Sequence, residues 1–557
     1  LLWRRLLVGG DEVSEQPSAD DRSLWLLGSV GFAMLVLGVW SESGITGQDE
    51  YWLSLRTPME MLDTGHLWTP WLDGEPRLKK PPLVYWGIAA AYRLFGVELF
   101  GARVWSVLCG VGLSVVTARL YRWIHGRGGF LAGLLVLGCA GVAVEARRAM
   151  LDLPMAFFAT LTVYLGAVWA RCGGWLRAVA AGGALGLGCM TKGPIALLFV
   201  GTAAASAFGA TRQRPRGSWW QLAGGLAVAA AIALPWPISM QILWPQFGAV
   251  LAEQAEQRQF SFARLASAPG VLGSTLGLVV PWAVVALAGA RSALSRADGD
   301  EQSARQRWLV WWCVLGVVPF FFFKAFERYT IPLTVPLCVL AAHRLLAVDV
   351  AGRRFHLRIA VALIAVPAVV LALFTLWFGD SVLAPVVTLV LLGLAIRAAT
   401  RAAAPHRTAG LSAMVLAAVL GWVYPSIGVN RLPRDLPADL ATRPVAVTRA
   451  QPGMLSVRRG HSVVEIPIGE PEHLTERLAK WRGYLCALDL DVPVVERHAV
   501  LAGIRLRRVR EFASLYSRKA WIQFVRPGAT WSDWRRAIRE RSLASLAPRF
   551  VLYSVEP

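Results

Sequence analysis

Charged residues are scarce in this 557-residue chain, where Asp, Glu, Lys and Arg together make up only 17% of the sequence. A soluble protein has about a quarter charged residues, so the scarcity argues against a soluble globular fold. Apolar residues make up 55%. They gather into runs of about 17–22 residues, the length at which a helix crosses a hydrocarbon core. The composition therefore indicates a polytopic α-helical membrane protein.

Several motifs are also missing. There is no Walker A loop and no GxGxxG after a strand pattern, which argues against an ATP-driven pump and against a Rossmann-type nucleotide-sugar site. The seven cysteines form no CxxC pair or Cys/His cluster, so neither a disulfide framework nor a thiolate metal site is indicated. We expect no metal site and no certain cofactor, and leave a divalent metal open.

Thirteen apolar runs define the predicted membrane domain, and a shorter one at 83–97 is expected to be an interfacial helix. The runs are 24–40, 101–122, 128–145, 152–170, 175–190, 193–209, 219–240, 270–290, 308–323, 330–347, 357–376, 382–397 and 409–425. We predict three regions: a cytoplasmic tail over 1–23, a transmembrane domain over 24–428 that includes a long first outer loop over 41–100, and a domain over 429–557.

Basic loops set the expected orientation. With the N-terminus in the cytoplasm, every inner loop carries at least two Arg, and the positive-inside rule then places the last domain outside. The basic residues behind the formal net charge of +21 are thus explained by the orientation of the protein in the membrane. We expect membrane lipids but no nucleic acid as partners. The predicted location is a bacterial inner (plasma) membrane, crossed many times, with a periplasmic or extracellular C-terminal domain.

The composition changes near residue 429, after which the apolar runs shorten to strand length. "PVAVTR", "SVVEIPI", "WIQFV" and "RFVLYSVEP" read as strands, while "PEHLTERLAKWRGYLCAL" (471–488) and "SDWRRAIRERSLASL" read as helices. A small C-terminal α/β extracytoplasmic domain follows from this pattern.

Charge on the outer face exceeds what topology explains. Of the six lysines, four fall in outer loops, namely Lys79, Lys80, Lys192 and Lys324. Lysine donates to phosphate oxygens as a point charge, and carboxylates stand in the same loops. Cations can neutralise a departing lipid phosphate, while a carboxylate accepts the proton of an incoming hydroxyl or amine. This combination favours glycosyl transfer from a polyprenyl-phosphate sugar.

Two alternatives compete with the enzyme. One is a transporter or flippase for an anionic lipid or solute, although such proteins place ionisable groups near the midplane. The other is a catalytically inactive assembly protein.

Several stretches resemble a known family. "GQDEYW", "GHLWTPWLDGEPRLKKPPLVYW" and "FGARVWSVL" resemble the first outer loop of bacterial membrane glycosyltransferases of the aminoarabinose transferase and protein mannosyltransferase type, which share the GT-C architecture. "RRAMLDLPMAFF" resembles their second acidic motif, "MTKGPIALL" their Thr-Lys-Gly-Pro turn and "RYTIPLTVPL" their Tyr-x-x-Pro stretch. The resemblance covers about residues 20–430. It implies transfer of a hexosyl or pentosyl group, with inversion, from a polyprenyl-phosphate-linked sugar donor to a lipid, glycan or protein acceptor.

The resemblance also assigns roles to residues. Asp49 matches the first-loop catalytic carboxylate and Asp152 the second essential acid, with Glu50 as a catalytic-site acid in an orienting role. The residues expected to bind the donor phosphate are Lys80, Lys192, Lys324, Arg147 and Arg328, and those expected to shape the loops are Pro81, Pro82 and Tyr329.

The sequence departs from the family pattern after Asp49. Trp52 and Leu53 stand where the family has an Arg and a Tyr, and Arg56, one helical turn later, is a candidate replacement for that Arg. Lys79 replaces the acid that commonly precedes Lys-Pro-Pro, which removes a possible metal ligand. The donor or acceptor is therefore expected to differ from that of the best-known members.

Overall fold

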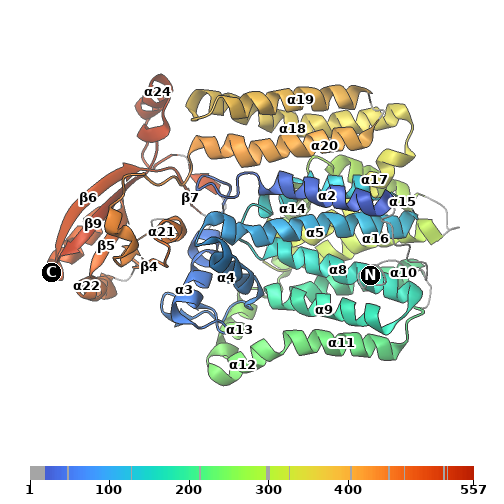
Figure 1. Ribbon diagram of the computed structural model, residues 1–557, viewed down its shortest axis with the longest axis horizontal. Coiled ribbons are helices and arrows are strands. Elements are labelled where there is room, and N and C mark those ends of the chain that lie inside the picture. Colours follow the sequence, from blue (N-terminus) through green and yellow to red (C-terminus); the bar gives the residue numbers. More distant parts are fainter. Residues whose placement is uncertain are drawn as a thin grey trace.

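The fold is taken from a computed structural model of the chain. It describes residues 19–46, 49–126, 128–211, 215–295, 301–324, 326–401, 404–448, 452–469, 471–518, 521–523 and 525–556. The predicted tail over 1–23 lies mostly outside the described residues. In Figure 1 the long helices lie lengthwise beside one another, and the C-terminal sheet lies beyond one end of them.

Helices account for nearly all of the chain up to residue 427; short 3-10 and π turns are labelled η. They are α2 (Ala19–Val36), η1 (Glu50–Ser54), α3 (Arg56–Thr64), α4 (Leu83–Phe95), α5 (Leu99–His125), α6 (Phe130–Leu137), α7 (Ala140–Glu145), α8 (Asp152–Cys172), α9 (Trp175–Lys192), α10 (Ile195–Thr211), α11 (Trp219–Ala233), α12 (Pro235–Leu243), α13 (Phe247–Glu256), η2 (Phe262–Ser267), α14 (Ala268–Leu278), α15 (Ala283–Leu294), α16 (Glu301–Val317), η3 (Val318–Phe321), η4 (Glu327–Leu333), α17 (Thr334–Ala347), α18 (Val350–Phe378), α19 (Leu383–Arg401), α20 (Pro405–Ala418), η5 (Val419–Val423) and η6 (Tyr424–Ile427).

The polytopic helical architecture is confirmed, whereas the count of thirteen spans is not. Within the described residues, seven helices are long and apolar enough to cross a membrane, or eight if the pair Phe262–Leu278 and Ala283–Leu294, bent by 106°, is one span. Several predicted runs fall on shorter helices, and the run at 128–145 is broken at Gly138 into α6 and α7. The number of spans therefore stays a prediction.

The first outer segment folds into two helices joined by a small hairpin. Strands β1 (Trp71–Leu72) and β2 (Glu75–Pro76) pair antiparallel. Their two-residue turn, Asp73–Gly74, has positive φ at both positions (58° and 79°), the conformation that Asp-Gly adopts most readily in hairpins. The apolar stretch 83–97 forms α4, as expected.

The C-terminal region forms a five-stranded sheet in the order β4-β3-β5-β9-β6. Its strands are β3 (Val445–Val447), β4 (Val464–Glu465), β5 (Gly483–Leu488), β6 (Arg505–Ala513) and β9 (Arg549–Glu556), and β7 (Tyr516–Arg518) pairs separately with β8 (Trp521–Gln523). Strands β4 and β5 run parallel to β3, while β9 is antiparallel to both β5 and β6. The accompanying helical elements are η7 (Ala438–Ala441), α21 (Pro452–Arg459), α22 (Pro471–Lys480), α23 (Val492–Leu501), α24 (Trp531–Glu540) and η8 (Leu543–Ser545).

One predicted helix in this region is wrong in its second half. The stretch 471–488 is helical only as α22, after which the chain enters the central strand β5. Gly483 at the junction has φ 139°, and every residue of β5 is buried. A continuously apolar run can be a buried strand as readily as a helix.

The first outer segment and the C-terminal sheet share one hydrophobic core. Leu55, Met59 and Val84 pack in the same buried cluster as Val447 and Leu552. These two regions therefore lie on the same side of the membrane helices, as Figure 1 also shows.

Candidate active site

Asp49 is the most accessible member of an ionic cluster at the helix ends. It immediately precedes η1, and its side chain is 45% exposed. Its carboxylate accepts a hydrogen bond from Nη2 of Arg328, a residue 279 positions further along the chain. The exposed carboxylate is thus held in place while one face stays open to an incoming group.

Asp152 is the buried partner of the same arginine. It is the first residue of α8, where the helix dipole favours a negative charge, and it is only 2% exposed. Its Oδ2 accepts from Nε of Arg328 at 3.2 Å, and its Oδ1 accepts from Nζ of Lys192. Arg328 therefore bridges two carboxylates, one buried and one open to solvent.

Lys192 closes the cluster from the opposite end of a neighbouring helix. It is the last residue of α9 and is buried against the ring of Tyr329, with 3.6 Å between Nζ and the ring centroid. A cation over an aromatic face is stabilised by the ring quadrupole. Asp49, Asp152, Lys192 and the neighbouring pair Arg328 and Tyr329 come from four separate segments, and the structure brings them together as the sequence predicted.

Lys80 lies near the same cluster, in the loop before α4. Its pKa is lowered to about 7, first by burial and then by the neighbouring cations Arg258, Lys192 and Arg77, against a raising effect of Asp152. A lysine among cations titrates near neutrality because its charged form lacks compensation. Such a site has positive charge to offer an anionic ligand.

Arg258 is a site residue that sequence reasoning missed. It lies in the segment between α13 and η2, is exposed, and acts electrostatically on both Lys80 and Tyr329. The sequence held no spacing that links Arg258 to Lys80, and it gave no reason to choose Arg258 over Arg264, six residues later. With Lys80, Lys192 and Arg328, it gives four cations near Asp49 and Asp152, and the pair of Arg148 with the buried Glu145 lies beside them.

Glu50 lies next to Asp49 in sequence but faces the helix core. It is fully buried, and its Oε1 accepts from Nε of Arg103 at 2.8 Å and from the Ala149 N–H at 3.0 Å. A fully buried carboxylate cannot contact a substrate directly, so this position leaves Glu50 only the orienting role expected of it, which stays a prediction. Glu50 anchors the start of η1 to the membrane helices.

The structure does not bring Arg147 into the cluster. This buried guanidinium donates to the carbonyl oxygens of Met34, Leu37 and Ala143, at 2.6, 3.0 and 2.6 Å. Two of those carbonyls lie at the C-terminal end of α2, where carbonyl groups lack helical partners and a cation is favourable. Arg147 therefore caps a helix, which corrects its assignment to the donor phosphate.

Lys324 and the two prolines stay predictions. Lys324 is exposed in the segment between η3 and η4, and no contact places it in the cluster. Pro81 and Pro82 are buried directly between Lys80 and α4, and the Pro82 carbonyl accepts from the Trp86 N–H at 2.8 Å. Their fixed φ suits the start of a helix. Within the described ranges, no group of three or more His, Cys, Asp or Glu is arranged to hold a metal ion.

Known proteins share this sequence pattern. A family model described as dolichyl-phosphate-mannose-protein mannosyltransferase matches residues 39–250. The chain is 31% identical over 307 residues to an undecaprenyl phosphate-alpha-4-amino-4-deoxy-L-arabinose arabinosyl transferase of Pseudomonas fluorescens, which covers 53% of this chain and 54% of that protein. The corresponding transferase of Pseudomonas aeruginosa is 28% identical over 350 residues, covering 58% and 60%. The chain thus spans little more than half the length of these curated relatives.

Solved structures share the fold. The crystal structures of ArnT from Cupriavidus metallidurans, one in the apo state and one bound to undecaprenyl phosphate, each match with a TM-score of 0.69 at 18% identity. Each match covers 88% of this chain and 97% of the other. These findings confirm the family resemblance and the GT-C type fold.

Proposed function

We propose that this chain, a relative of the undecaprenyl-phosphate aminoarabinose transferases, is a glycosyltransferase that moves a sugar from a polyprenyl-phosphate donor to an acceptor. The observation that carries the proposal is the linked set Asp49–Arg328–Asp152–Lys192. It combines an open carboxylate with an excess of cations at the ends of membrane helices, which are the two things that this transfer needs.

In this reaction the carboxylate of Asp49 acts on the acceptor, while the cations act on the phosphate of the donor. Asp49 accepts the proton of the acceptor hydroxyl or amine as that group attacks the anomeric carbon. The bond between this carbon and the phosphate oxygen breaks, and its electron pair leaves with the polyprenyl phosphate. Attack opposite the leaving group inverts the anomeric configuration.

The cations stabilise the leaving phosphate. Arg258 and the protonated form of Lys80 carry positive charge that no ion pair with a carboxylate offsets in the described residues, and Lys192 acts electrostatically on Lys80. Preorganised cations of this kind stabilise charge that develops in the transition state. Asp152 is too buried to meet the substrate, and its part is to position Arg328 and Lys192.

Orientation and substrate choice belong to the proposal as well. We place the cluster and the C-terminal domain on the extracytoplasmic face of a bacterial inner membrane, with the N-terminus in the cytoplasm, as the basic inner loops favour. The curated relatives are named for a pentose donor, so we propose a pentosyl or closely related amino sugar, with a lipid as the first acceptor class to test.

The test is release of undecaprenyl phosphate by the purified protein in lipid nanodiscs. Undecaprenyl-phosphate-linked aminoarabinose and mannose serve as donors, with an extract of bacterial envelope lipids as the acceptor. We expect Asp49→Asn to lower release by at least about 10²-fold, the usual contribution of a general base. The matched control is Asp63→Asn, which alters another half-exposed carboxylate of the first outer segment, one paired with His461.

The outcomes separate the rivals. A transporter or flippase would move the lipid across the bilayer without releasing undecaprenyl phosphate, and an inactive assembly protein would do neither. Full activity of Asp49→Asn, or an equal loss in Asp63→Asn, would contradict the role given to Asp49.

A further inference from the structure

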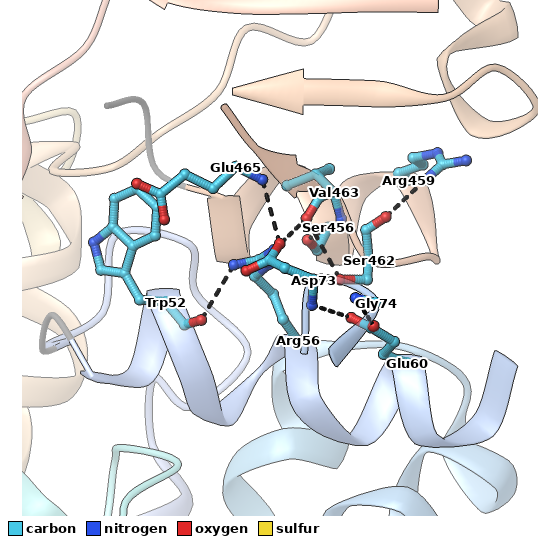
Figure 2. Close-up of polar contacts among 10 residues, drawn as sticks. All are labelled: Trp52, Arg56, Glu60, Asp73, Gly74, Ser456, Arg459, Ser462, Val463 and Glu465. Carbon is cyan, nitrogen blue, oxygen red and sulfur yellow. Dashed lines mark hydrogen bonds and ion pairs between the residues drawn. The ribbon is translucent and has the colours of Figure 1, made fainter. Parts of the chain in front are cut away.

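A buried arginine joins the segment that carries Asp49 to the C-terminal domain. Figure 2 shows Arg56, at the start of α3, lying between the first outer segment and the strand that contains Glu465. Its side chain is 1% exposed. The guanidinium donates from Nη1 to the Trp52 carbonyl at 3.3 Å, and from Nη2 to Asp73 and to the Val463 carbonyl at 2.5 Å.

These partners belong to three different structural units. Trp52 lies in η1, three residues after Asp49; Asp73 forms the tip of the hairpin; and Val463 belongs to the C-terminal domain. The planar guanidinium presents five N–H donors in a fixed fork, so one side chain can hold all three at once. The hydrogen-bond partners of Arg56 are Trp52, Asp73 and Val463, none of which belongs to the ionic cluster. In this structure Arg56 therefore does not take the place of the missing family arginine in that cluster.

The carboxylates around Arg56 reinforce the joint. Glu60 accepts from the backbone N–H groups of Asp73 and Gly74, at 2.8 and 2.6 Å, and so fixes the turn that presents Asp73. Asp73 in turn accepts from the Glu465 N–H at 3.3 Å. Burial raises the pKa of Glu465, and the charge of Asp73 raises it further, while Arg56 opposes both effects. A single guanidinium therefore compensates acidic groups from both sides of the interface.

Apolar packing gives the joint its stiffness. Helix α21 of the C-terminal domain packs against both η1 and α3. Leu55, Met454, Leu455 and Val463 lie in one buried cluster. A displacement of the domain would therefore be transmitted to η1 and not absorbed by a loop.

We propose that Arg56 is a positioning residue for Asp49, through which the C-terminal domain holds the carboxylate at its working distance. The segment from 49 to 56 is fixed at two points. Glu50 ties its start to Arg103 in α5, and Arg56 ties its end to the hairpin and to the C-terminal domain. Releasing the second point leaves η1 free to tilt about Glu50, which would reorient the backbone of the adjacent Asp49 and swing its carboxylate away from Arg328. The inference rests on the proposed function for its catalytic consequence, but not for the positioning itself.

The first test is a split between turnover and binding. We expect Arg56→Met to lower kcat by about 10²-fold, the cost of a misplacement near 1 Å, while the donor KM changes by less than about threefold because the phosphate-binding cations do not lie on η1. Arg56→Lys keeps the charge but cannot hold all three partners, so an intermediate loss of about tenfold is expected. Asp73→Asn, which tolerates the left-handed turn, provides a second route to the same effect if Arg56→Met does not fold.

The matched control is Arg458→Gln. Arg458 of the C-terminal domain pairs with Glu42, which precedes Asp49 in the first outer segment. The change therefore also breaks an ion pair between the C-terminal domain and the first outer segment, but that pair does not involve a residue of η1. We expect its kcat to stay within twofold of the unchanged protein. An equal fall in both variants would show that general domain contact, not Arg56, positions Asp49, and an unchanged kcat in folded Arg56→Met would overturn the proposal outright.

The second test needs no enzymatic activity. Hydrogen–deuterium exchange of the backbone amides of residues 50–55 should speed up by at least tenfold in Arg56→Met and stay unchanged in Arg458→Gln. Unchanged exchange in Arg56→Met would refute the positioning role, whatever the reaction is. If exchange is faster in Arg56→Met but the protein transfers no sugar from any donor, the positioning role of Arg56 is supported and the proposed function is refuted.

Discussion

Lys80 provides the sharpest quantitative prediction, because its pKa of about 7 lies within the range where enzymes are assayed. Burial and three neighbouring cations favour the neutral amine, so lowering the pH through 7 restores its positive charge. A donor in which one phosphate joins a lipid to a sugar is a diester and carries a constant single negative charge over this range. The pH dependence of donor capture should therefore follow the protonation of Lys80.

The magnitude follows from the titration curve. With a pKa of about 7, roughly three-quarters of Lys80 is protonated at pH 6.5 and roughly one-thirtieth at pH 8.5. The kcat/KM for the donor reports groups of the free enzyme, so we expect it to fall about twentyfold between these two pH values. Once bound, the phosphate stabilises the charged amine, so kcat should fall less than kcat/KM does.

The assay compares three proteins over pH 6 to 9 with the same undecaprenyl-phosphate sugar. Lys80→Arg carries a permanent charge and should give a flat kcat/KM across the range. Lys79→Met removes the neighbouring, exposed lysine and should keep the slope of the unchanged protein. A flat profile in the unchanged protein, or a slope that persists in Lys80→Arg, would refute the argument that Lys80 binds the phosphate.

Two further predictions concern the residues that the structure moves out of the chemistry. Arg147→Met should lower the melting temperature in detergent, because it leaves the carbonyls at the end of α2 without a donor, yet leave the donor KM unchanged; a raised KM would return Arg147 to the phosphate site. Glu50→Gln should cost about 3–5 kcal/mol by leaving Arg103 buried without a counter-charge, seen as a loss of folded protein on size-exclusion chromatography. Adding Arg103→Gln should recover part of that loss, and no recovery would show that the pair is not the cause.

The convergence of the cluster could be predicted from the sequence because the signals were charges at the ends of apolar runs. Asp152 begins one predicted apolar run and Lys192 follows the end of the next, so each residue is expected at a membrane boundary. Because successive spans run in opposite directions, the start of one and the end of the next lie at the same boundary. Arg328 stands just before the run 330–347, whereas Asp49 lies in the long loop that follows the run 24–40. The topology alone brings such residues to the same depth in the membrane, and the attraction between their opposite charges favours contact between them.

Side-chain direction could not be predicted in the same way. Neighbouring side chains at a helix boundary point in different directions, so Arg147 and Arg148 after α7, or Asp49 and Glu50 at the start of η1, share a boundary and face different partners. Arg147 turns towards α2, and Arg148 pairs with Glu145 at 2.5 Å. Which of two adjacent side chains faces the ionic cluster depends on the packing between helices, and the hydrophobic periodicity of the sequence does not specify that packing.

Contacts between distant loops were equally out of reach. Arg258 and Lys80 belong to different outer loops, and Arg56 meets Val463 across 407 positions. No spacing rule links such residues, because the loops between helices have no common period. The separation of α22 from β5 failed for a related reason, since the short apolar run after Trp481 fits a strand and a helix equally well until its neighbours β3 and β9 are known.

The most direct test of the central claim is an experimental structure of the protein with undecaprenyl phosphate bound in a lipid nanodisc. The account predicts the phosphate within about 3 Å of Nζ of Lys80, a hydrogen-bond distance, with Arg258 or Lys192 as a second donor and Asp49 facing the space where the sugar would be. A phosphate bound away from these cations, or at the opposite ends of the helices, would contradict the account.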